Sequence, residues 1–173
     1  MNNRLQHHFD TLQLQKEKLI ERIRQSPEKF DIKPNNASWS IHEVVAHIIT
    51  AEKLSAFYLQ KKIQAIDNVG NTGLWEEFKM LSVRIAQRLP LKFKAPKKVV
   101  ERTTSYKNLD ELIHDWNDTR DLLRVELEKI NDHQVKRKIF KHIVAGRMNA
   151  AHAIEFLHEH INHHQRQLNR LLR

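Results

Sequence analysis

The chain has 173 residues, no cysteine, only 3 glycines and 4 prolines, and a formal net charge of +9. This length is enough for one domain, 1–173, whose hydrophobic core is stable without disulfide bonds or a structural metal ion. The absence of cysteine excludes disulfide bonds and metal sites with thiolate ligands. Scarce turn residues and abundant Leu, Lys, Glu, Arg, Gln and Ala favour a few long helices, so we expect an all-α fold.

The positive charge is spread along the sequence and is not interleaved with aromatic residues. We interpret it as a solvated surface and rank an anionic partner such as nucleic acid behind that interpretation. No stretch approaches the ~18 consecutive apolar residues that cross a bilayer, and the first residues lack the apolar core of a signal peptide. We therefore expect a cytoplasmic protein that does not contact membranes.

Apolar residues at helical spacing predict a first helix over roughly 3–26, which Pro27 ends. The second helix, over roughly 41–65, has the best-defined start in the chain. Ser40 and Glu43 have the spacing of a capping box, in which each side chain bonds to the backbone of the other residue. His47 belongs to the inward apolar stripe of this helix, since it lies three residues after Val44.

A shorter helix is predicted over about 74–89, ending before Pro90. Its apolar stripe consists of Leu74, Phe78, Leu81 and Ile85. The segment 91–107 is predicted to lack regular structure. We interpret Trp75 and Trp116 as core residues, and Trp39 as a staple or core anchor in preference to a substrate wall.

Asn108 is a predicted cap for a helix that ends near Asn131, and a basic loop over 132–147 precedes a last helix over about 149–172. The prediction is thus four long helices and one additional short helix. Such a set forms a four-helix bundle with an added crossover.

The last helix holds five of the twelve histidines: His152, His158, His160, His163 and His164. At ~100° per residue, His160 and His164 face inward with the leucine seam, His158 faces solvent, and the other two lie at the flank. A spacing of four lets two imidazoles reach one metal ion. Together with His47 they describe an open metal site, with the satisfied core histidine as the alternative for each residue.

Two stretches resemble the DinB-like family, which includes YfiT-type metal-dependent hydrolases. WSIHEVVAH, from Trp39 to His47, is similar to that family's W-S-x-x-E-x-x-x-H, and HINHHQRQ, from His160 to Gln167, is similar to its late H-x-x-x-H-x-x-Q. The resemblance covers nearly the whole chain. At one position the chain differs, because Arg166 stands where many relatives have glycine.

The resemblance implies an up-down-down-up four-helix bundle that forms a homodimer and holds one divalent metal ion on His47, His160 and His164. We expect zinc or nickel, with iron or manganese as alternatives. Gln167 could bond to a ligand histidine, and a plain polar role is the alternative. Glu43 could orient His47, but the capping box explains it equally well.

We expect a hydrolase that uses a metal-bound water on a small-molecule substrate, with no catalytic residue identified beyond that water. The first alternative is a metal-dependent transferase that adds a low-molecular-weight thiol to electrophiles. The second is a non-catalytic metal-binding stress-response module. A nucleic-acid binder ranks last.

Overall fold

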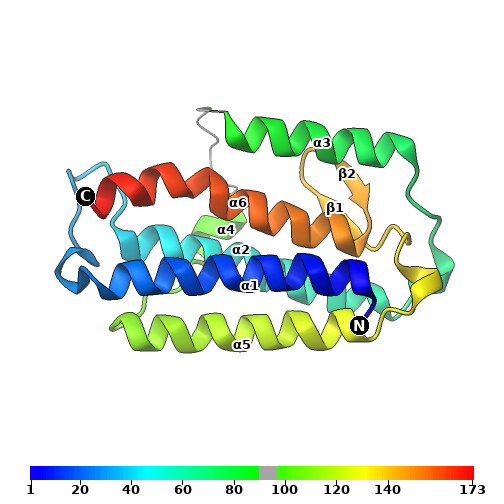
Figure 1. The fold of residues 1–173 in the computed structure, drawn as a ribbon, viewed down its shortest axis with the longest axis horizontal. Helices are drawn as coiled ribbons and strands as arrows, with labels where there is room; N and C mark the ends of the chain where they lie inside the picture. Colours follow the sequence, from blue (N-terminus) through cyan, green and yellow to red (C-terminus); the bar gives the residue numbers. More distant parts are fainter. Residues whose placement is uncertain (90–96) are drawn as a thin grey trace.

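A computed structural model of the chain describes residues 1–89 and 97–173 (Figure 1). Its four longest helices lie lengthwise beside one another, with α1 and α6 running in one direction and α2 and α5 in the opposite one. Their bounds are α1 Asn3–Arg24, α2 Ile41–Ile63, α5 Leu109–Glu128 and α6 Ala150–Leu171. Each begins and ends within a few residues of its predicted position, and the mostly helical fold is confirmed.

Two further helices occur in the described residues: α3, Leu74–Arg88, and α4, Lys97–Glu101. α3 packs along α6 on the outside of the molecule (Figure 1). Short 3₁₀ helices lie at Pro27–Lys29, Ile66–Asn68 and Asp132–Gln134. No helix in the described part combines the length and hydropathy that crossing a bilayer requires.

The helix starts are fixed by polar side chains, as the sequence predicts. Ser40 Oγ accepts from the backbone N–H of Glu43 at 3.2 Å, and Glu43 Oε2 accepts from that of Ser40 at 2.9 Å. Asn108 caps α5 in the same way, at 2.9 Å from the N–H of Glu111. These bonds satisfy N–H groups that have no partner within the helix, and so set the residue at which each helix begins.

The prediction of unstructured connections is wrong in two places. The segment 91–107 contains α4, although 91–96 lies outside the described residues. The predicted basic loop at 132–147 contains an antiparallel hairpin of β1, Phe140–His142, and β2, Gly146–Met148. Gly146 has a φ of +77°, which glycine adopts without strain. Three-residue strands are too short for an alternating pattern to reveal.

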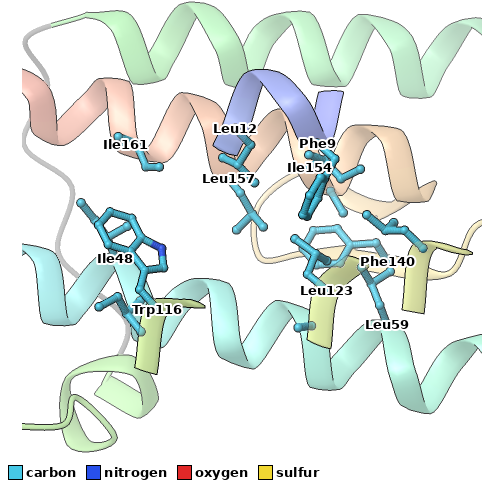
Figure 2. Packing of buried hydrophobic residues seen from close by; sticks show 14 of the residues in the cluster. Phe9, Leu12, Ile48, Leu59, Trp116, Leu123, Phe140, Ile154, Leu157 and Ile161 are labelled. Atoms are coloured by element: carbon cyan, nitrogen blue, oxygen red, sulfur yellow. The ribbon is translucent and has the colours of Figure 1, made fainter. Parts of the chain in front are cut away.

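Apolar side chains from the long helices form one core, which includes Leu12, Ile48, Leu123 and Leu157 (Figure 2). Trp116 is fully buried in this core, as predicted. Trp75 is not a core residue, since 63% of it is exposed on α3. Periodicity predicts that a helix has an apolar stripe, but it does not show which way the stripe faces.

A buried ion pair joins α2 to α5. Arg120 on α5 donates from Nε and Nη2 to the two carboxylate oxygens of Glu52 on α2, at 2.8 and 2.9 Å. The indole N–H of Trp116 donates to the same carboxylate at 2.8 Å. Both charged side chains are almost wholly buried. Because the two opposite charges stabilise one another in a low-dielectric interior, removal of either side chain destabilises the other.

We expect Arg120→Met to lower the free energy of unfolding by about 3–5 kcal/mol, because Glu52 then stays buried without the guanidinium that pairs with it. Urea unfolding followed by circular dichroism measures this change. The control is Arg124→Met on the same helix, where an exposed arginine lies 3.5 Å from Asp121; we expect a change of about 0.5 kcal/mol or less. Equal effects of the two variants would contradict the structural role of the pair.

His142 at the end of β1 is buried, and its Nδ1 accepts from the backbone N–H groups of Val144 and Ala145 at 3.2 and 3.0 Å. Burial lowers its pKa from 6.5 to about 4. Between these two values the unfolded chain binds more protons than the folded protein. The free energy of unfolding therefore falls as the pH falls from 6.5 towards 4.

His142→Asn keeps a side-chain acceptor but does not titrate. We expect the wild-type protein to lose about 3 kcal/mol more than this variant between pH 7 and pH 4, from ~1.4 kcal/mol per unit of pKa shift. Urea unfolding at several pH values in the presence of a chelator measures the difference. Parallel pH profiles for the two proteins would show that His142 is not held neutral.

Candidate metal centre

His47 reaches the candidate site from α2. The capping box at Ser40 fixes where α2 begins, and His47 follows two turns later on the face that packs inward between Val44 and Ile48. Only 4% of His47 is exposed. A histidine in this position must find a partner inside the protein, since burying its polar nitrogens alone costs free energy.

His160 and His164 reach the same point from α6. Four residues separate them, so they lie one above the other on the face turned towards α2. The ring centroid of His47 is 5.1 Å from the centroid of each, and the two are 4.9 Å from one another. The structure thus brings together the three histidines that the sequence singles out.

The three side chains have the arrangement of a metal ligand set. Each offers one ring nitrogen, and these nitrogens all lie within 4.8 Å of one another. The Nε2 atoms of His47 and His160 are 3.2 Å apart. Two imidazoles bound tetrahedrally at ~2.0–2.1 Å from one zinc ion place their nitrogens about 3.3 Å apart. Within residues 1–89 and 97–173 no other such group of His, Cys, Asp or Glu occurs.

The facing Nε2 atoms of His47 and His160 also fit a bound cation. The facing Nε2 atoms can satisfy one another only if one carries a proton and the other does not. A shared metal ion would accept a lone pair from each ring, which removes this conflict.

The electrostatics keep the three rings neutral. Burial lowers the pKa of His47 from 6.5 to about 4 and that of His164 to about 3, and a neighbouring histidine adds to both effects. The pKa of His160 lies well below its usual value for the same two reasons. At neutral pH each ring therefore has a free lone pair, which is the form that binds metal.

Two aromatic side chains hold the imidazoles in place. Trp39, just before α2, lies with its ring 5.2 Å from that of His47. Phe156 stacks on His160 at 5.8 Å with an angle of 18° between the ring planes. Trp39 is half-buried and packs against the core, so it anchors the start of α2, as predicted. It also contacts His47, a candidate ligand.

Gln167 and Glu43 differ in their relation to the ligands. Gln167 Oε1 lies 3.4 Å from Nδ1 of His164, which leaves Nε2 of that ring for a metal. Glu43 binds the backbone of Ser40, and its other oxygen accepts from Lys33 Nζ at 2.6 Å. Its two oxygens are thus occupied by the helix cap and an ion pair, and neither bonds to His47.

The other histidines of α6 do not join the group. His158 is half-buried with 26% of its side chain exposed, and not fully in solvent as expected. His152 is fully buried, with Nε2 3.1 Å from Glu77 of α3, where the sequence had placed it at the flank. His163 packs beside His164, with Nδ1 3.2 Å from the carbonyl oxygen of Gln87.

The sequence analysis did not predict two ion pairs that join α3 to α6. Arg84 donates to Glu155, and Arg88 donates from Nε and Nη2 to Glu159 at 2.9 and 2.6 Å. Both acids lie on α6 near the candidate ligands, and both are occupied by arginine. The matching four-residue spacing of the arginines and the glutamates is the sequence signal that could have revealed this contact.

Comparison with known proteins gives one match. The sequence model of the DinB superfamily matches residues 3–168 of the chain, and this range includes all three candidate ligands. A search of curated proteins and a search of solved structures found no match. Because the family match covers nearly the whole sequence, the chain belongs to the DinB superfamily.

Proposed function

We propose that the protein is a metal-dependent hydrolase of small molecules, with one divalent ion held by His47, His160 and His164. In this proposal residues 1–173 form one domain, an up-down-down-up four-helix bundle of α1, α2, α5 and α6 with α3 added outside. Superfamily membership and the three-histidine group support the proposal.

The single observation that carries the proposal is the number of ligands. Three neutral imidazoles converge, and within the described residues no fourth side chain completes the set. Structural zinc sites use four protein ligands, whereas catalytic sites use three and leave a position for water or substrate. A divalent ion in such a site polarises a carbonyl group and lowers the pKa of coordinated water.

The chain's own residues supply positioning. Trp39 and Phe156 pack against the rings of His47 and His160 and limit their rotation. Gln167 contacts Nδ1 of His164 and favours one orientation of that ring. Partners of this kind orient ligands and raise metal affinity, typically by 10–100-fold. An all-imidazole set favours zinc or nickel over the oxygen-seeking ions.

Protein purified without a histidine tag is expected to bind one divalent ion per chain. The double variant His160→Ala, His164→Ala removes two of three ligands, so we expect at least a 100-fold loss of affinity for zinc. Competition with a chromophoric chelator measures the affinity. His158→Ala, on the same helix but outside the group, should bind as the wild-type protein does. Unchanged binding by the double variant would disprove the site.

The metal-loaded protein is expected to hydrolyse members of a panel of activated esters and amides. Activity should be lost on chelation, return on addition of the metal, and be absent from the His160→Ala variant, because the ion activates the attacking water. A chromogenic assay of product release measures this, with His158→Ala as the active control. Turnover that survives both chelation and loss of His160 would contradict the proposal.

A parallel screen with a low-molecular-weight thiol and an electrophile separates the two enzyme classes. Metal-dependent consumption of thiol without ester or amide hydrolysis would replace the hydrolase by a transferase. Failure in both screens by a protein that still binds zinc would indicate a non-catalytic metal-binding protein.

A further inference from the structure

A lysine interrupts the apolar stripe of α1. Most buried residues of this helix recur at steps of three and four, and Lys16 occupies one of these positions between Leu12 and Leu19. Only 3% of Lys16 is exposed. A lysine at such a position of a helical bundle costs free energy, because its ammonium group loses contact with water. A group of opposite charge beside it would offset this cost.

The hydrogen bond that holds Lys16 is made with a neutral group. Its Nζ donates to Oδ1 of Asn117 on α5 at 2.7 Å. The buried acid that interacts with Lys16 is Glu52, whose carboxylate already accepts two hydrogen bonds from Arg120 and one from Trp116. In the part of the chain that the structure describes, Lys16 forms no ion pair of its own. An ammonium group has three N–H donors, so it can bond to an anion as well as to Asn117.

Two buried cations thus share one buried carboxylate. The exposed fractions of Lys16, Arg120 and Glu52 are 3%, 2% and 0%. Burial lowers the pKa of Lys16, and the charge of Arg120 lowers it further. Glu52, Glu17 and Asp121 act in the opposite direction without cancelling these effects. This level of the bundle therefore carries an excess of positive charge, which an anion beside Lys16 would neutralise.

A cleft between α1 and α5 gives an anion access to Lys16. Its volume is about 510 Å³, which lies within the ~300–1,000 Å³ range of small-molecule sites. One face of α1, from Gln13 to Arg24, lines one side, and α5 lines the other with Ile113 and Asn117, one turn apart. Asn117 is exposed, and it lines the same cleft as the lysine to which it bonds. A ligand that enters from solvent can therefore reach the ammonium group.

The other side chains that line the cleft define the kind of anion. Ile20 of α1 and Ile113 of α5 offer apolar surface on the two sides, which suits an anion with an apolar body. Glu17 and Glu21 also line the cleft. These two acids would repel an anion of high charge such as phosphate, whereas a single carboxylate matches the one excess positive charge at Lys16.

We propose that the cleft between α1 and α5 binds a small monocarboxylate with an apolar body. The carboxylate accepts a hydrogen bond from Lys16 Nζ, and the apolar part packs against Ile20 and Ile113. Hydrogen bonds between two charged groups are shorter and stronger than those between neutral groups. The three candidate metal ligands lie on α2 and α6, so this inference does not rest on the proposed function.

The first test uses the wild-type protein at pH 7 with acetate, isocaproate and benzoate as probes. In an NMR titration we expect saturable shifts of the backbone amide signals around Lys16 and Ile113, with acetate the weakest ligand because it lacks an apolar body. Isocaproamide has the shape of isocaproate without its charge, and it should bind at least about 10-fold more weakly. Equal binding of the amide, or no saturable binding by any of the three carboxylates, would overturn the proposal. Inorganic phosphate that binds as tightly as isocaproate would overturn the assignment to monocarboxylates.

The second test removes the charge. Lys16→Met keeps a long side chain in the stripe, and Lys18→Met makes the same change at an exposed position of α1. We expect the dissociation constant for isocaproate to rise at least about 10-fold in Lys16→Met and to stay unchanged in Lys18→Met. Isocaproate should also raise the urea midpoint of the wild-type protein and of Lys18→Met, because a ligand of the native state stabilises it. Circular dichroism checks that each variant is folded. Wild-type affinity in Lys16→Met would overturn the proposal.

Discussion

The candidate site depends on the fixed position of α2 against α6. His47 supplies its ring from one helix, while His160 and His164 supply theirs from the other, and the facing nitrogens are 3.2 Å apart. Moving α2 along its axis by one residue would shift His47 by ~1.5 Å and rotate it by ~100°, which would take it out of the group. The capping box fixes where α2 begins, and the Glu52–Arg120 pair locks the helix to α5. The site thus relies on polar contacts some distance from it.

Charged groups have different roles near the three histidines and on α3. Around the three histidines, the neighbouring acids are occupied by arginines, and burial keeps the imidazoles neutral. Those same arginines attach α3 to the helix that carries two of the candidate ligands. Because ion pairs make this attachment, the apolar side of α3 is left in solvent. The contact between α3 and α6 thus decides which face of α3 is exposed.

Much of the fold and site was predictable, because long helices repeat their pattern over many turns. The caps at Ser40 and Asn108 and the inward phase of His47, His160 and His164 follow from local sequence alone. The five-residue α4 and the three-residue strands are shorter than the periods that would reveal them. Trp75 was misplaced for a different reason: the arginines and glutamates between α3 and α6 decide which face of α3 is inside, and that is a tertiary contact.

The central claim is that His47, His160 and His164 bind one metal ion and leave part of its coordination sphere open. X-ray absorption spectroscopy of the zinc-loaded protein tests this most directly, because it counts imidazole ligands and measures their distances. We expect three imidazole nitrogens at ~2.0–2.1 Å with an additional oxygen from solvent, and fewer imidazoles in the His160→Ala variant. A spectrum with fewer than three imidazoles, or with four ligands from the protein, would contradict the claim.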